Sequence, residues 1–341
     1  MSTETPTPAP KPTPVPTTGY VPDTGIRGAG TTAVTAVTGP QRLGDRVFSG
    51  VSTTAGVVIL VVLAGVTLFL VSESLPVLGA DAADVPGDGG FFTYLAPLLF
   101  GTVLVAVIAL LIAFPFSIAI ALFISHYAPR RLTRPLGYVV DLLAAIPSIV
   151  YGLWGVQVVA PYVQPSYVWL ADNLGFLPFF QAPASRSGLT VLTAGIVLSI
   201  MILPIMAAID REVFLQTPTL HEEAALALGA TRWEMIRMSV IPYGKSGVVS
   251  GAMLGLGRAL GETIAVLLVL SASGGISLNL IGRANAPTIP SNIASNFPEA
   301  TGLTLNTLIA TGLVLFLVTF AVNFAARAVL ARRAEFDGAA G

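Results

Sequence analysis

The chain lacks cysteine altogether, and only two of its 341 residues are histidine. The absence of cysteine excludes disulfides and thiolate metal sites, and His126 and His221 are too few for a histidine-rich metal site. Charged residues are also scarce: they make up 10% of the chain, whereas a soluble domain carries about 25%. With 54% hydrophobic residues and a mean hydropathy of +0.81, the composition predicts an all-α integral membrane protein without a metal site.

The chain also lacks the motifs of a nucleotide-hydrolysing or catalytic protein. It contains no G-x-x-x-x-G-K-S/T loop, so we expect it to bind neither ATP nor any other cofactor. No Ser–His set or metal cluster supports a catalytic site, so an enzyme is not expected. The formal net charge of −1 gives no indication of a nucleic-acid partner, and we expect none.

Six apolar runs are candidates for membrane spans, each of which needs about 20 residues of helix. The runs are 51–71, 95–124, 138–160, 189–209, 246–272 and 303–322. The second run has about 30 residues and contains Pro115, so a single kinked or tilted helix is expected there. Splitting this run in two would give seven spans instead.

Lysine and arginine are distributed unevenly between these runs. Of the 17, four precede the first run, three lie in 125–136, four in 210–245 and three after the last run. The other side receives only Arg186 and Arg283, and Arg258 falls inside the fifth run. Because basic residues concentrate on the cytoplasmic side, six transmembrane helices with both termini cytoplasmic are predicted. A seventh span would break this asymmetry.

The chain is therefore predicted to have four parts. Residues 1–45, rich in proline and threonine, are expected to form a disordered cytoplasmic tail. Residues 46–92 would hold the first transmembrane helix and an outer loop, and 93–328 would form the main transmembrane domain. Residues 329–341 would be a second cytoplasmic tail.

Two opposite charges, Arg258 and Glu262, fall within the fifth run. On a continuous helix, residues four apart share one face, so the two side chains are expected to lie together. A charge at bilayer depth costs roughly 3 kcal/mol or more, and such residues usually face a bundle interior or an aqueous path. The pair is predicted to serve an anion in transit. The alternative is an ion pair that only fixes helix packing.

The same run is rich in glycine. Gly255 and Gly257 do not open a G-x-G-x-x-G phosphate loop, because Leu260 stands at the third glycine position and no strand precedes them. Gly251 with Gly255, and Gly257 with Gly261, are instead G-x-x-x-G pairs, which permit close contact between helices. These four glycines are predicted to form a packing surface.

The third run contains the sequence Ile146-Pro147-Ser148, which predicts a helix break. A break frees backbone groups that, with Pro147 and Ser148, can line a polar path. The alternative is an ordinary proline kink in which the Ser148 hydroxyl bonds back to the helix backbone.

The longest segment between runs is the polar stretch 210–245, and within it 217–243 predicts two short helices. Thr219 can cap the first, which extends over 219–227. Glu222 and Glu223 fall in its first turn, where the helix dipole favours acidic residues.

Gly229 can adopt the positive φ that ends this first helix. A second helix is expected over 233–240, ending before Pro242. Such a helix–turn–helix is compatible with a plain amphipathic hairpin at the membrane surface.

The segment Glu223-Ala224-Ala225, followed by Gly229 and Pro242, resembles the EAA loop of ABC importer permeases. One departure is Ser239, which stands where the family usually has an aliphatic residue. The resemblance implies a type I ABC permease bundle over 93–328. It also implies that 217–243 holds a coupling helix that docks into a cytoplasmic ATPase, with Glu222 a further candidate for this contact.

Three other stretches, 145–152, 201–204 and Arg258-Ala259-Leu260-Gly261-Glu262-Thr263, are similar to the phosphate-specific permeases of the PstC type. In that family the arginine and glutamate of the last motif are implicated in phosphate translocation. The resemblance therefore implies that Arg258 and Glu262 act on phosphate. Gly251, Gly255 and Gly261 are then expected to pack against the partner permease that the family implies.

The prediction is a non-enzymatic permease subunit of an ATP-driven phosphate importer, multi-pass in the lipid bilayer of a prokaryotic cell membrane. The family implies a heterodimer with a PstA-like permease, two cytoplasmic PstB-like ATPase subunits that hydrolyse ATP, and an extracytoplasmic PstS-like phosphate-binding protein. Three alternatives stay open: a permease for sulfate or molybdate, a membrane enzyme acting on a phosphorylated lipid, and a secondary transporter. The EAA-like loop disfavours the last.

Overall fold

The computed structural model describes residues 43–87, 89–273 and 275–338. The predicted disordered tail, 1–45, therefore lies almost entirely outside the described residues. Within the described ranges, all regular structure is helical except for one isolated bridge between Ala272 and Asn285. The prediction of an all-α protein is confirmed.

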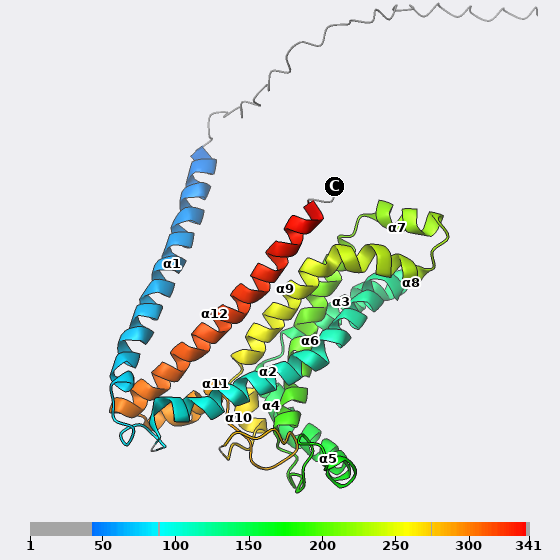
Figure 1. Cartoon of the computed structure of the whole chain (residues 1–341). Helices are drawn as coiled ribbons and strands as arrows, with labels where there is room; N and C mark the ends of the chain where they lie inside the picture. The colour runs from blue at the N-terminus through cyan, green and yellow to red at the C-terminus, as the bar shows by residue number, and fades with distance from the viewer. Residues whose placement is uncertain (1–42, 88, 274, 339–341) are drawn as a thin grey trace, which may run out of the picture. The chain divides into compact units, whose positions relative to one another are not determined.

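The chain divides into two units between Val58 and Ile59, inside helix α1 (Leu43–Leu78). In the first unit, the described residues form the beginning of α1, whose large apolar side chains are exposed. The second unit carries all other elements (Figure 1). These are α2 (Gly90–Leu122), η1 (Phe123–Tyr127), α3 (Arg130–Ala144), α4 (Ser148–Trp154), η2 (Gly155–Val159), α5 (Ala160–Leu174), α6 (Val191–Leu215), α7 (Thr219–Ala227), α8 (Arg232–Met235), η3 (Ile236–Val240), α9 (Ile241–Leu260), α10 (Ile264–Val269), α11 (Ile289–Asn296), η4 (Phe297–Glu299) and α12 (Gly302–Gly338).

Among the described residues, four helices are long and apolar enough to cross a membrane: Arg46–Leu78, Gly90–Tyr127, Val191–Leu215 and Gly302–Ala328. A fifth candidate is the pair Arg130–Ala144 and Ser148–Leu174. The protein is therefore a multi-pass membrane protein. The second apolar run forms one helix with Pro115 inside it, as predicted, and the seven-span alternative is wrong. The count of six spans and the side on which the termini lie stay predictions.

The third run does not form a straight span. The helices before and after Pro147 are bent by 88°, so the expectation of a helix break is confirmed. Proline lacks an N–H and disfavours the helical conformation in the residue before it, which explains the break. Across the bend, the Tyr151 hydroxyl donates a 2.9 Å hydrogen bond to the carbonyl of Leu143.

The fifth run is also interrupted, which the sequence did not predict. Helix α9 ends at Leu260 with Gly261 as its C-cap, and α10 begins only at Ile264. Gly255, Gly257 and Gly261 weaken the helix here, because each glycine costs about 1 kcal/mol relative to alanine inside a helix.

Helix α6 lies at the centre of the second unit. Its most apolar stretch is 61% buried, against 28% for the corresponding stretch of α2 and 17% for that of α12. Only α6 among these is enclosed by the chain itself, between α2 and α9. The other spans leave apolar faces for lipid or for another subunit.

Glycines make the contact between α9 and α6 close. A Cβ added to Gly244 would lie 2.8 Å from the Phe214 ring, and one on Gly247 would collide with Val213. Further along, Gly251 faces Ile209 and Asp210, and Gly255 faces Met206. The glycine stripe therefore packs inside this chain, so the expectation that Gly251 and Gly255 face a second permease is wrong.

Different elements lie at the two ends of the bundle. Helices α7 and α8 lie at one end, while α5 and the loop that follows α10 lie at the opposite end (Figure 1). Helix α9 leads from the first end towards the second, so the interrupted fifth run connects them.

Replacing Gly247 by alanine is expected to lower the free energy of unfolding by about 1 to 2 kcal/mol. Overpacking destabilises a protein by roughly 1 to 3 kcal/mol, and the higher helix propensity of alanine over glycine offsets part of this loss. Gly257 is the matched control, because a Cβ there meets nothing within 4 Å. Thermal unfolding of the detergent-purified variants tests this: equal midpoints for Gly247→Ala and Gly257→Ala would contradict the packing described.

Candidate functional site

Glu262 lies at the interruption between α9 and α10, where it is 8% exposed. Its Oε1 accepts a 3.1 Å hydrogen bond from the backbone N–H of Ala265, in the first turn of α10. The carboxylate, one residue before the N-cap Thr263, thus caps α10 by binding an N–H of its first turn, where negative charge is favourable, while the Thr263 side chain makes no such bond. The expectation that Glu262 and Arg258 share one face of a continuous helix is wrong, because the helix does not continue between them.

Arg258 lies in the last turn of α9 and is half-buried. Among the described residues it forms no ion pair, and its buried Nε has no hydrogen-bond partner. The alternative of a static Arg258–Glu262 ion pair is therefore not what this conformation contains. A guanidinium keeps its charge in proteins, so this side chain offers several uncommitted donors to an anion.

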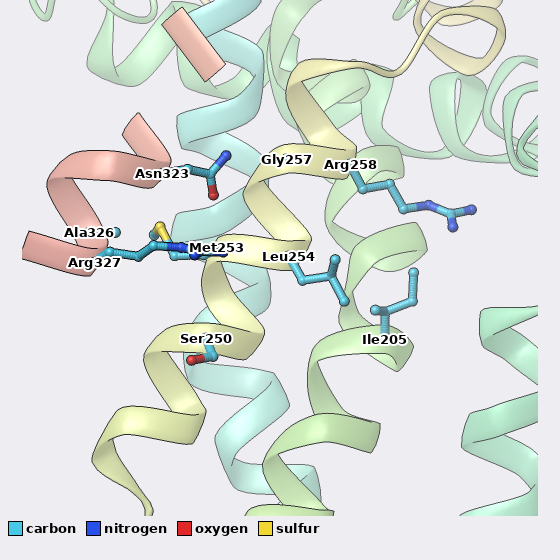
Figure 2. A pocket seen from close by; sticks show the side chains of 9 residues that line it. All are labelled: Ile205, Ser250, Met253, Leu254, Gly257, Arg258, Asn323, Ala326 and Arg327. Atoms are coloured by element: carbon cyan, nitrogen blue, oxygen red, sulfur yellow. The ribbon is translucent and has the colours of Figure 1, made fainter. Parts of the chain in front are cut away.

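A cleft of about 620 Å³ runs along the exposed face of α9 beside Arg258. Figure 2 shows that α12 contributes Asn323, Ala326 and Arg327 to one flank, and α6 contributes Ile205 to the other. The Arg258 side chain points away from α12, on the flank opposite Arg327 (Figure 2).

The floor of the cleft comes from the exposed face of α9 itself. The residues that line it there are Ser250, Met253, Leu254, Gly257 and Arg258. Gly257 thus belongs to the floor of the cleft, and a Cβ added to it would have no atom of the described chain within 4 Å. Gly261 is the C-cap of α9, where the closest atoms belong to the preceding turn. Neither of these two glycines contacts α6 as Gly251 and Gly255 do.

The break at Pro147 lies beside the break at Glu262. A Cβ on Gly152 would be 2.9 Å from the Cα of Ala265, and one on Gly155 would be 2.7 Å from Val269. The earlier residue, Gly152, lies beside Ala265, and the later residue, Gly155, lies beside Val269. The two helices therefore run parallel, and α4 and α10 begin at the same level. Pro147, which is exposed, and the half-buried Ser148 therefore belong to the same region as Glu262.

The segment 217–243 contains the predicted helix–turn–helix. Helix α7 is preceded by Pro218 as N-cap, so Thr219 begins the helix and does not cap it. Gly229 adopts φ +87°, and the amides of Gly229 and Ala230 bond to the carbonyls of Leu226 and Ala225 at 3.0 and 3.2 Å. This is a Schellman motif, which requires the left-handed conformation that glycine adopts without strain.

The EAA-like residues divide between surface and interior. Glu223 and Ala224 are exposed, whereas Ala225 is buried against Met235 and Ile236. Glu223 and Ala224 are therefore accessible to another molecule, while the small side chain of Ala225 allows α7 to pack on the following helix.

Helix α8 begins with a capping box. The Thr231 hydroxyl accepts from the Glu234 amide, and the Glu234 carboxylate accepts 2.8 Å bonds from the amide and hydroxyl of Thr231. The hydrogen bond from the Thr231 backbone, and after it the bond from the Thr231 hydroxyl, hold the pKa of Glu234 below its ordinary value.

The second helix does not end before Pro242, as had been expected. It continues from α8 through the π-helical turn η3 directly into α9, where Pro242 lies in the first turn. Within this continuous helix Pro242 lacks the N–H that would bond to the preceding turn. It directly follows the π-helical turn η3, where the Ile241 N–H bonds to the Ile236 carbonyl, and both features mark a local departure from regular α-helix. One continuous helical rod therefore connects the surface segment to Arg258.

Two polar contacts add to the packing of α7 on the rest of the chain, and neither was predicted. His126 Nε2 lies 3.4 Å from Glu222 Oε1, and the other ring nitrogen of His126 lies 2.7 Å from Ser125 Oγ. The Ser239 hydroxyl donates a 3.3 Å bond to the His221 carbonyl, so the residue that departs from the EAA pattern holds α7 in place. The sequence carries no signal for the His126 contact, because 96 residues separate the partners.

Comparisons with known proteins agree with this architecture. The family model for the binding-protein-dependent transport system inner membrane component matches residues 113–335, more than half of the chain. A bacterial alginate ABC transporter, crystallised with a pentasaccharide-bound periplasmic protein, aligns with a TM-score of 0.55 at 14% identity. That alignment covers 83% of this chain and 93% of that one, and shows a shared fold.

Curated relatives are considerably more similar. Phosphate transport system permease protein PstC 2 of Mycobacterium tuberculosis is 46% identical over 303 residues, covering 85% of this chain and 93% of that protein. The protein named PstC in Mesorhizobium japonicum is 40% identical and covers 85% and 91%. PstC of Xylella fastidiosa is 42% identical and covers 80% and 88%. The chain therefore belongs to the binding-protein-dependent inner membrane components and, among these ABC importer permeases, to the PstC family.

Proposed function

We propose that this chain is the PstC-type subunit of an ATP-driven importer of inorganic phosphate in a prokaryotic cell membrane. The observation that carries the proposal is the uncommitted Arg258 guanidinium on the wall of a cleft in a membrane helix. Arginine remains charged and binds phosphate oxygens through forked donors. The names of relatives that are 40 to 46% identical support phosphate as the substrate.

Arg258 and Glu262 have different tasks in this proposal. Arg258 is the group that meets the anion, while the Glu262 carboxylate remains bound to the Ala265 amide. Pairing of the two charges after the anion leaves would require Glu262 to release α10. Such an exchange would keep phosphate binding weak enough for release and would make the break between α9 and α10 part of the gate. Pro147 and Ser148, at the same level, are proposed to line the path.

Glu222, Glu223, Ala224, Ala225, Gly229 and Pro242 are proposed to shape the surface that docks a PstB-like ATPase, since this chain has no nucleotide-binding loop of its own. Around this surface, large apolar side chains project outward: Leu220 is 72% exposed, Leu228 91% and Trp233 54%. Exposed apolar groups of this size commonly mark a protein interface. A PstA-like second permease and a PstS-like binding protein complete the proposed complex, and the face of α9 that bears the cleft is available to the former.

Arg258→Gln is expected to abolish phosphate uptake while leaving the complex assembled, because in this proposal the guanidinium meets the anion, and among the described residues it forms no ion pair that holds the fold. Arg327→Gln is the matched control: it removes the same charge from the other flank of the same cleft and should retain most of the uptake. Radiolabelled phosphate uptake in a deletion strain measures both, with excess sulfate as competitor. Wild-type uptake by Arg258→Gln, or strong competition by sulfate, would refute the assignment.

Glu262 can be tested separately as a cap and as a charge. Glu262→Gln keeps an oxygen acceptor for the Ala265 amide, so thermal stability should match the wild type while phosphate uptake falls. Glu262→Ala should also lose about 1 kcal/mol of stability, the usual cost of a lost cap. If Glu262→Gln transports phosphate normally, the carboxylate is only a cap and its proposed role in the gate is incorrect.

Gly229→Ala should reduce ATP hydrolysis stimulated by the loaded binding protein, because a residue with a Cβ is strained by about 1 to 2 kcal/mol at this φ. Gly229→Asn is the control, since asparagine tolerates the left-handed conformation better. No atom lies within 4 Å of the added Cβ, so the change does not create a clash within the chain. Equal activity of the two variants would show that the turn geometry is not needed for coupling.

A further inference from the structure

A small polar pocket lies at the end of the bundle opposite α7 and α8. Its volume is about 290 Å³. Four of its six lining residues are serines, from two loops: Ser185 and Ser187 before α6, and Ser271 and Ser273 after α10. Arg283 and Ala284 complete the wall.

The charge around this pocket is positive. Of the 17 lysines and arginines, only Arg186 and Arg283 fall in the predicted outer loops, and both belong to the segments that form the pocket. No acidic side chain lines it, and among the described residues Arg283 forms no ion pair. The few cations on this side of the protein are therefore concentrated where serine hydroxyls gather.

The two loops are held together by buried Asn285, which is 1% exposed. Its side-chain amide donates to the carbonyls of Ser271 at 3.0 Å and Leu189 at 3.5 Å. The Ser273 hydroxyl donates a 2.9 Å bond to the Arg283 carbonyl, and the Ser185 amide donates a 2.8 Å bond to Ile281. The pocket is thus built on a fixed backbone.

Several donors in this pocket are uncommitted. Among the described residues, Ser271 and Arg283 make side-chain-mediated hydrogen bonds only through their backbone carbonyls, so the Ser271 hydroxyl and the Arg283 guanidinium are uncommitted. Ser185 and Ser187 share one hydrogen bond at 3.2 Å, which leaves one of their two protons free. Hydroxyls that converge with a guanidinium, without a carboxylate nearby, suit a tetrahedral oxyanion.

Helix α10 connects this pocket to the membrane site. It runs from the Glu262 cap to Val269, and Ser271 follows two residues later. At 1.5 Å per residue, the six residues of α10 span about 9 Å. With the two further residues to Ser271, extended at about 3.3 Å each, the pocket lies roughly 15 Å along the chain from the break beside Arg258.

We propose that the pocket formed by Ser185, Ser187, Ser271, Ser273 and Arg283 is an entry site that binds phosphate before it reaches Arg258. The proposal rests on the proposed function in phosphate import, and it adds a second binding step on the other side of α10. A rival use of the same charge is recognition of acidic side chains on the binding protein.

The test uses the complete importer in proteoliposomes, driven by saturating phosphate-loaded binding protein. Arg283→Gln and, separately, Ser271→Ala remove uncommitted donors. Arg186→Gln is the matched control, because it removes the same charge from the same side without lining the pocket. Phosphate uptake and the affinity of the binding protein for the importer are both measured.

Arg283→Gln is expected to lower uptake at least about tenfold, the effect of losing one charge-assisted hydrogen bond, with a smaller loss for Ser271→Ala and little change for Arg186→Gln. Binding-protein affinity should stay within twofold of wild type. Wild-type uptake by Arg283→Gln, equal losses in Arg283→Gln and Arg186→Gln, or a loss explained by weaker binding-protein docking would each overturn the entry site. Failure of the wild-type importer to move phosphate would instead refute the proposed function.

Discussion

The hydrogen bond between the Ala265 amide and the Glu262 carboxylate is the interaction on which the rest of the membrane site depends. It starts a new helix three residues after the previous one has ended, and so divides the fifth apolar run into two parts. It also commits the Glu262 carboxylate to α10, and among the described residues Arg258 forms no ion pair. The guanidinium is left with uncommitted donors in a cleft, which is what a transient anion site requires.

The packing of α9 on α6 provides the fixed reference for this site. Glycines at 244, 247, 251 and 255 bring the two helices close together, so this part of α9 cannot shift without disturbing α6. Gly257, on the other face of α9, faces open space and lines the cleft, whereas Ala259 and Leu260 further along are buried in the core. The same helix thus presents one face packed in the core and one open face, with Arg258, to the cleft, so Arg258 stands on a fixed support.

Much of the architecture follows from local sequence signals. The positive φ of Gly229, the single long α2 and the break at Pro147 were predicted because glycine, an uninterrupted apolar run and proline act through short-range physics. The break at Glu262 was missed because the i, i+4 argument assumes a continuous helix. A carboxylate just after a glycine-rich helical stretch is also a capping signal, and hydropathy averaged over the run does not reveal it.

Contacts between distant segments were beyond the sequence. His126 and Glu222 are partners only because η1, which continues α2, lies beside α7, and in the sequence Ser239 is only a departure from a pattern. The glycine stripe was recognised as a packing surface, but its partner was misassigned, since G-x-x-x-G spacing does not say which helix approaches. The fold and the family could be predicted, whereas the pairing of individual side chains required the three-dimensional arrangement.

The uninterrupted rod from α8 through η3 and α9 has a mechanical consequence. Arg232, at its surface end, and Arg258, near its membrane end, are 26 positions apart in the sequence, or roughly 40 Å along the helix axis. A rod of that length acts as a lever arm. A tilt of about 5° at the surface end displaces the other end by about 3 Å, comparable to one hydrogen-bond length. Small rotations of α7 and α8 are thus sufficient to make or break a contact with an anion at Arg258.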